Sequence, residues 1–161
     1  ERPHRCRTWA PKGQTPVLQY NFHWKMLSAA AGLTFDDLYF RFYQGAIRSA
    51  QVVQFLKGLQ QRLERPLLLI WDGLPAHRSW LLQEFLRTSG GWIEQVWLPA
   101  YRPELNPLEC VWGYWKQHEL PNVCPTDYWE LSDMARRKLR NLRRRKRLIP
   151  SFWKQAERSL E

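Results

Sequence analysis

The stretch Leu67-Leu68-Leu69-Ile70-Trp71-Asp72-Gly73 decides the fold class. Its five consecutive apolar residues are typical of a strand that is buried on both faces of a sheet. Around it the pattern predicts strands between residues 17 and 47, then a helix that Ser49 caps and Pro66 stops. A helix from Ser79 to Thr88, a strand Ile93–Leu98 and a helix after Pro107 follow. This alternation predicts an α/β protein, a mixed sheet flanked by helices.

Asp72 stands directly after the apolar strand, and groups at the carboxyl end of a central strand face the ligand crevice of such a sheet. By itself Asp72 also fits a turn with Gly73, since Asp-Gly is a strong turn dipeptide. Glu109 has a similar alternative. Asn106 is the capping residue, Pro107 the first helical residue and Glu109 the third, which is a capping-box arrangement.

The two carboxylates are more informative as a pair. Asp72 ends a strand and Glu109 opens a helix two elements later, so both can project to the same edge of the sheet. Carboxylates held in this way bind Mg²⁺ well, because a hard cation prefers oxygen ligands. Two such ions activate a nucleophile and stabilise a leaving oxygen in phosphodiester chemistry.

Composition excludes several other classes of protein. The chain has 161 residues, of which 44% are hydrophobic and ten are Trp, so a packed core is expected and wholesale disorder is excluded. No apolar run approaches the roughly 18 residues that cross a bilayer, so we expect no membrane partner. The three cysteines, Cys6, Cys110 and Cys124, form neither a disulfide framework nor a zinc motif, which favours a cytoplasmic location.

The net charge of +10 is concentrated in one basic run. A polyanion is the natural partner of such a run, because phosphate neutralisation releases counterions; a solvated helix face is the alternative. An apolar stripe through Leu131, Ala135, Leu139 and Leu142 predicts a docked helix that carries the charge outward. The candidate DNA-binding residues are Arg136, Arg137, Lys138, Arg140, Arg143, Arg144, Arg145, Lys146 and Arg147.

Three blocks of sequence carry a family resemblance. They are Arg7-Thr8-Trp9-Ala10-Pro11-Lys12-Gly13-Gln14-Thr15-Pro16, then Ile70-Trp71-Asp72-Gly73-Leu74-Pro75-Ala76-His77-Arg78-Ser79, then Leu98-Pro99-Ala100-Tyr101-Arg102-Pro103-Glu104-Leu105-Asn106-Pro107-Leu108-Glu109. In this order, and with a mid-thirties spacing from Asp72 to Glu109, they resemble a DDE transposase of the Tc/mariner superfamily, in its bacterial insertion-sequence branch.

The resemblance implies a ribonuclease H-like fold and Mg²⁺-dependent cutting and joining of transposon ends, with Mn²⁺ as a possible substitute. Asp72 is then the second carboxylate of the catalytic triad and Glu109 the third. The first is expected on a strand before the Trp-Ala-Pro-Lys-Gly block, but the sequence has no Asp before Asp36. We therefore expect residues 1–125 to be a catalytic core without its first strand, and residues 126–161 a basic helical segment. The isolated chain is expected to be inactive.

The resemblance further implies transposon-end and target DNA as partners, a homodimer in the full-length protein and a nucleoid-associated bacterial location. Four residues lie beside the expected site: His77, Tyr101, Arg102 and Asn106. His77 fits a capping or positioning role, Asn106 a helix cap, and Tyr101 and Arg102 either phosphate contacts or loop packing. Two other functions stay open: a decayed or repurposed DNA-binding domain without catalysis, and a structural domain in which Asp72 and Glu109 are only a turn residue and a cap.

Overall fold

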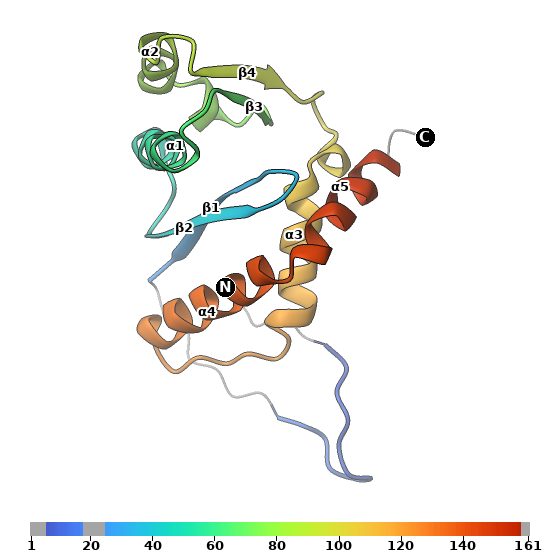
Figure 1. Cartoon of the computed structure of the whole chain (residues 1–161). Helices are drawn as coiled ribbons and strands as arrows, with labels where there is room; N and C mark the ends of the chain where they lie inside the picture. The colour runs from blue at the N-terminus through green and yellow to red at the C-terminus, as the bar shows by residue number, and fades with distance from the viewer. Residues whose placement is uncertain (1–5, 18–24, 159–161) are drawn as a thin grey trace.

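The computed structural model describes residues 6–17 and 25–158 (Figure 1). The strands and helices follow in the order β1 (Leu27–Leu33), β2 (Leu38–Gln44), α1 (Ser49–Leu63), β3 (Leu67–Trp71), α2 (Trp80–Thr88), β4 (Ile93–Trp97), α3 (Pro107–Tyr114), α4 (Tyr128–Arg144) and α5 (Ile149–Glu157). Short helical turns join them: η1 (Pro75–Arg78), η2 (Pro103–Leu105), η3 (Trp115–Glu119) and η4 (Lys146–Leu148). The expected order of strands and helices is thus present.

The strands form two pairs. β1 and β2 make an antiparallel hairpin in which Leu33 is opposite Leu38, whereas β3 and β4 are parallel, with Trp71 opposite Trp97. Within the described residues no hydrogen-bonded ladder joins the two pairs. β1 and β2 lie within residues 17–47, where strands were expected, and residues 18–24 of that range lie outside the described residues.

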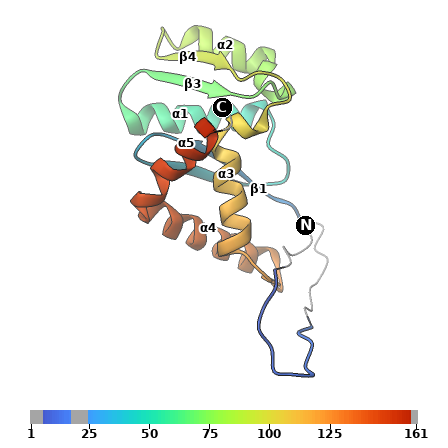
Figure 2. The same ribbon diagram turned by 90° about the vertical axis from the view of Figure 1, so that its right-hand side faces the viewer.

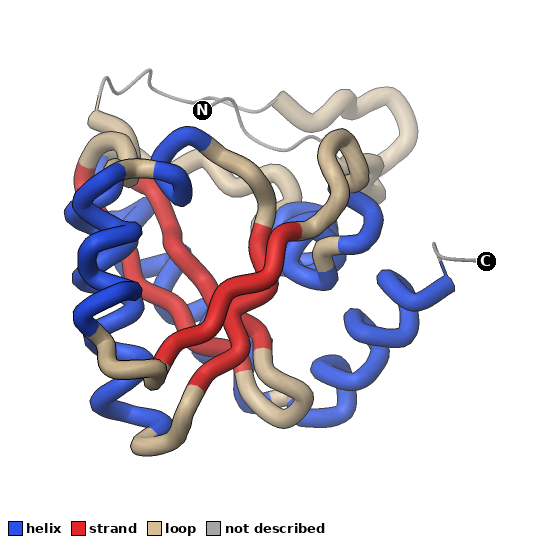
Figure 3. The backbone as a smooth tube through the Cα atoms, turned by 90° about the horizontal axis from the view of Figure 1, so that it is seen from above, coloured by secondary structure: helices blue, strands red, loops and turns tan. Residues whose placement is uncertain are grey.

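Helices cover the strand pairs on two sides, which gives a layered α/β arrangement (Figures 1 and 3). α1 and α2 bury Leu56, Leu82 and Leu86 in one core cluster with Trp71 and Ile93 of the parallel pair. A second cluster lies between the hairpin and the helices α3, α4 and α5; its buried members are Leu38, Val111, Leu139, Leu142, Ile149 and Phe152. The hairpin therefore separates two cores.

β2 shows how one strand serves both cores. Leu38 and Phe40 pack in the cluster with α4, while Tyr39 packs in the cluster with α1, as the two-residue period of a strand requires. β3 behaves differently from the sequence prediction. Leu67 and Leu69 pack toward α1 and α2, but Leu68 is 61% and Ile70 48% exposed, so the prediction of a strand buried on both faces was wrong. The described residues supply no element that covers the second face of this pair.

Local signals explain several helix ends. Ser79 caps α2, since its hydroxyl accepts a hydrogen bond from Leu82 N at 3.4 Å. α1 differs slightly from expectation: Arg48 is the cap, and the Gln51 side chain accepts from its backbone N–H at 3.0 Å. The same helix ends at Leu63, where Glu64 adopts a left-handed conformation with φ 49°.

The C-terminal helices are part of the fold. Ala135, Leu139 and Leu142 of the predicted apolar stripe are fully buried in α4, and Leu131 is partly buried. Ile149 of α5 is fully buried as well. Figure 2 shows both helices and α3 packed beside the strands. None of the helices that the structure describes is long and apolar enough to cross a membrane.

Candidate active site

Asp72 and Glu109 line one open pocket. Asp72 follows β3, and Glu109 lies in the first turn of α3. The pocket has a volume of about 180 Å³, and its other walls are Gly73, Asn106 and the loop from Leu98 to Pro103. Two residues from different elements are therefore brought together at the carboxyl ends of the parallel strands, as the sequence predicted.

The Asp72 carboxylate is oriented by its own neighbours. Its Oδ1 atom accepts a hydrogen bond from the backbone N–H of Leu74 at 3.3 Å and lies 3.0 Å from Nδ1 of His77. The Asp72 side chain is still 46% exposed. Within the described part of the chain Oδ2 has no hydrogen-bond partner, so it is available to a ligand in the pocket.

His77 is held in place by several contacts. Its ring stacks on the Trp71 indole with centroids 4.4 Å apart and planes within 10°. Nδ1 also lies 3.1 Å from the backbone carbonyl of Asp72, and the carbonyl of His77 accepts a hydrogen bond from Gln83 at 3.0 Å. The histidine that the sequence left between a cap and a positioning residue thus contacts the carboxylate directly. The stack on Trp71 was not foreseen, although a Trp at the end of the central strand was its visible signal.

Asn106 and Glu109 have different roles at the start of α3. Asn106 caps the helix, because its side chain accepts a hydrogen bond from Leu108 N at 3.1 Å. The capping box is not completed, since among the described contacts the Glu109 carboxylate makes no bond back to Asn106. Glu109 is exposed and lines the pocket.

Tyr101 and Arg102 belong to the loop that lines the pocket. Tyr101 has a left-handed backbone, φ 59°, and a side chain that is 99% exposed. Arg102 is paired with Glu104 at 3.2 Å, and a hydrogen bond within Glu104 together with this pairing holds the pKa of Glu104 below its usual range. The Arg102 charge is therefore partly neutralised before any ligand binds.

The donor set fits a divalent metal of the Mg²⁺ type. Two carboxylates face an open, water-accessible pocket, and hard cations bind such oxygens while keeping waters for a substrate phosphate. Within residues 6–17 and 25–158, however, no group of three or more Asp, Glu, His or Cys side chains is placed to hold a metal ion. The pair thus supplies two of the three carboxylates expected of a triad.

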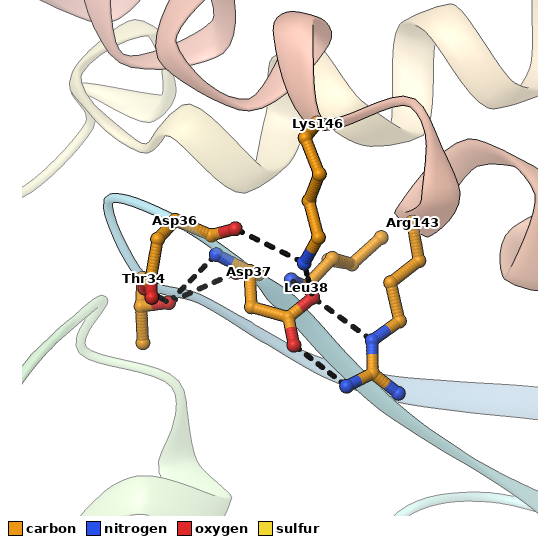
Figure 4. Close-up of polar contacts among 6 residues, drawn as sticks. All are labelled: Thr34, Asp36, Asp37, Leu38, Arg143 and Lys146. Carbon is orange, nitrogen blue, oxygen red and sulfur yellow. Dashed lines mark hydrogen bonds and ion pairs between the residues drawn. The ribbon is translucent and has the colours of Figure 1, made fainter.

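The basic run is divided between two roles. Arg143 donates hydrogen bonds to both Asp37 carboxylate oxygens, at 2.9 and 2.6 Å, and Lys146 donates one at 2.8 Å (Figure 4). Burial by itself raises the pKa of Asp37, but these bonds and the one from Leu38 N outweigh it and hold the pKa well below its usual range. These two cations tie the hairpin turn to α4 and η4.

Glu119 is the second buried acid that engages the run. It is 5% exposed and pairs with Arg145 at 2.7 Å and with Lys138 at 3.8 Å. Arg136 bonds to Ser132 at 3.2 Å and lies over the Phe42 ring. The remaining residues of the run, Arg137, Arg140, Arg144 and Arg147, are exposed. Sequence reasoning missed Asp37 and Glu119, because no local pattern marks an acid that will be buried against a distant helix.

Comparison with protein families assigns the chain to one of them. A family described as the DDE superfamily endonuclease matches residues 1–131, well over half of the sequence, so the chain belongs to this family. A comparison with curated proteins found no significant match.

Solved structures give the particular fold. The Mos1 transposase paired-end complex with left transposon end is similar with a TM-score of 0.66 and 16% identity, over 95% of this chain and 46% of that one. The Mos1 mariner paired-end complex with Mn has a TM-score of 0.63 and 19% identity, over 98% of this chain and 48% of that one. The Mos1 transposase catalytic domain with Raltegravir and Mg has a TM-score of 0.57 and 17% identity, over 84% of this chain and 75% of that one.

The chain spans about half the length of the first of these transposases. The fold is that of the ribonuclease H-like catalytic domain of Mos1 transposase, and the prediction of this fold from the sequence is confirmed. The insertion-sequence branch stays a prediction.

Proposed function

We propose that this chain forms a DDE-type transposase catalytic domain that cleaves DNA and transfers strands at transposon ends. The observation that carries the proposal is the shared pocket of Asp72 and Glu109 at the carboxyl ends of β3 and β4. Membership of the DDE endonuclease family and the likeness to transposases bound to transposon ends support it.

In this proposal Asp72 and Glu109 hold Mg²⁺, or Mn²⁺ in its place. The bound metal supplies activation of the attacking oxygen and stabilisation of the leaving oxygen. The chain's own residues orient the carboxylates: His77 and Leu74 N fix Asp72 Oδ1, and the cap at Asn106 fixes the helix that carries Glu109.

DNA is the proposed partner, and the exposed arginines of α4 and η4 contribute to binding it. Arg137, Arg140 and Arg144 are three and four residues apart along α4, so they share one helix face, and Arg147 continues the charge into η4. This subset replaces the full run of nine as the proposed phosphate contacts. A homodimer of the full-length protein and a nucleoid-associated location remain parts of this proposal.

A second function, DNA binding without catalysis, is favoured by one observation. The pocket has two carboxylates, and within the described residues no group of three or more Asp, Glu, His or Cys side chains is placed to hold a metal ion. Since the family's chemistry uses three carboxylates, we propose that the 161-residue chain by itself binds metal weakly and does not cleave DNA.

A titration with Mn²⁺ tests the metal site. Binding is measured as the decrease of the electron paramagnetic resonance signal of the free ion. We expect weak binding by the chain and its loss in Asp72→Asn and in Glu109→Gln. Glu104→Gln is the matched control, because Glu104 is a nearby carboxylate engaged by Arg102. Binding that survives both site variants contradicts the proposed metal site.

Cleavage of a supercoiled plasmid in Mg²⁺ then separates the two functions. Absence of nicking by the chain together with site-dependent Mn²⁺ binding supports a catalytic domain that needs a further ligand. Nicking that depends on Asp72 and Glu109 contradicts the proposed inactivity of the isolated chain and excludes the non-catalytic alternative.

A further inference from the structure

We propose that Arg78 binds a backbone phosphate of DNA beside the Asp72–Glu109 pocket. This inference rests on the proposed function, because it names a contact of the same site with the same nucleic acid. Arg78 was not among the basic residues that the sequence singled out, since it lies far from the basic run.

A ladder of rings fixes the position of Arg78. Its guanidinium lies over the Trp97 ring, 5.4 Å from the centroid. Trp97 stacks with Trp71 at 5.6 Å, and Trp71 stacks with His77 at 4.4 Å. His77 and Arg78 are neighbours in η1, so one helical turn lays both on the tryptophans that end β3 and β4.

Gly73 brings the guanidinium close to the metal-binding carboxylate. A Cβ atom at position 73 would lie 2.7 Å from Nη2 of Arg78, so only a glycine leaves room for the side chain as it stands. Gly73 follows Asp72 directly and lines the same pocket. Arg78 therefore lies against the backbone of the site, where a scissile strand would pass the carboxylates.

The charge of Arg78 is available. Within the described ranges, 6–17 and 25–158, no carboxylate lies within 4 Å of its guanidinium, whereas Arg102 is paired with Glu104 and Arg87 with Glu84. Asp72 is engaged by His77 and Leu74 N instead. A planar guanidinium that is exposed, unneutralised and held on an aromatic face is suited to bidentate phosphate binding.

The salt dependence of DNA binding tests the contact. Fluorescence anisotropy with a short fluorescein-labelled duplex of arbitrary sequence, over a series of KCl concentrations, gives the slope of log K against log salt. Loss of one phosphate contact flattens this slope by about 0.9. We expect this change in Arg78→Ala and none in Arg87→Ala, which removes the same charge from a residue paired with Glu84.

Gly73→Ala separates position from charge. It keeps every charge but displaces the flexible end of Arg78, so we expect it to flatten the slope as Arg78→Ala does. Circular dichroism confirms that each variant is folded. Equal slopes for the wild type, Arg78→Ala and Arg87→Ala overturn the inference, as does absence of DNA binding by the wild type at low salt. In either case the Mn²⁺ titration still judges the proposed metal site independently.

Discussion

Arg143 donates two hydrogen bonds to the carboxylate of Asp37, at 2.9 and 2.6 Å, across 106 positions of sequence. The contact joins the turn of the β1–β2 hairpin to the end of α4, and Lys146 strengthens it from η4 (Figure 4). An arginine from the most basic stretch of the chain is thus used inside the molecule. Arg143 and Lys146 therefore stabilise the fold, in contrast to the exposed arginines that we propose as DNA contacts.

The Asp37 carboxylate should make stability depend on pH. Its pKa is lowered in the folded protein, so the folded state favours the charged form, and unfolded Asp has a pKa of about 3.9. The stabilisation is therefore present above that value and is lost as the pH falls toward the folded pKa. Urea unfolding at several pH values between neutral and strongly acidic will measure it.

Asp37→Asn is the corresponding variant. We expect it to lower the free energy of unfolding by about 2 kcal/mol at neutral pH, which is the typical contribution of hydrogen bonds to a charged group. In acid the loss should become progressively smaller. Asp133→Asn is the control, since the Asp133 side chain is 78% exposed and its carboxylate is as far as 4.0 Å from the Arg137 guanidinium. Coincident pH profiles of the unfolding free energy for the wild type and Asp37→Asn would show that the ion pair adds no stability.

Arg143 and Arg144 should behave differently although they are adjacent and chemically identical. Arg143→Ala is expected to destabilise the fold by about 1.5–3 kcal/mol, because it leaves Asp37 without its main partner, and to leave the salt slope of DNA binding unchanged. Arg144→Ala is expected to flatten that slope by about 0.9 with little effect on stability. Urea unfolding and anisotropy titrations measure both. The reverse pattern would mean that the basic run contacts DNA through Arg143.

Residues 1–125 should not fold without the helices that follow. Their removal exposes Leu38 and Val111, which are fully buried against α4 and α5. We expect the shortened chain to lack a cooperative urea transition. In the full chain, Leu139→Ala should cost about 2–5 kcal/mol. A shortened chain that unfolds cooperatively would make residues 126–161 a separate unit, in agreement with the boundary expected from the sequence.

His77 should act on the metal through Asp72. Residues that orient a metal ligand typically contribute a factor of 10–100 to affinity, so His77→Ala is expected to weaken Mn²⁺ binding about tenfold. Rescue by His77→Asn, which retains a side-chain donor, distinguishes positioning from packing on Trp71. His118→Ala is the control, because His118 packs against Tyr114 and does not line the pocket. Unchanged Mn²⁺ affinity in His77→Ala would leave the histidine a structural role only.

The candidate site was largely predictable from local sequence. Asp72 follows an apolar run, and Glu109 follows an Asn-Pro helix start, so each is placed by rules that act over a few residues. The fold class followed from the order of such segments. Arg78 was not predictable, because its place depends on Trp97 from another strand and on the absence of a side chain at Gly73.

The sequence alone determined the order of elements, the capped starts of α2 and α3, the apolar stripe of α4 and the two carboxylates at one edge of the strands. Only the tertiary structure decided which cations are neutralised, which face of β3 is covered and what lies against the carboxylates. Periodicity and capping depend on residues within one or two turns of one another. The ion pairs of Asp37 and Glu119, by contrast, join residues 19 to 109 positions apart in sequence, and a charge is paired or free only once the helices have packed.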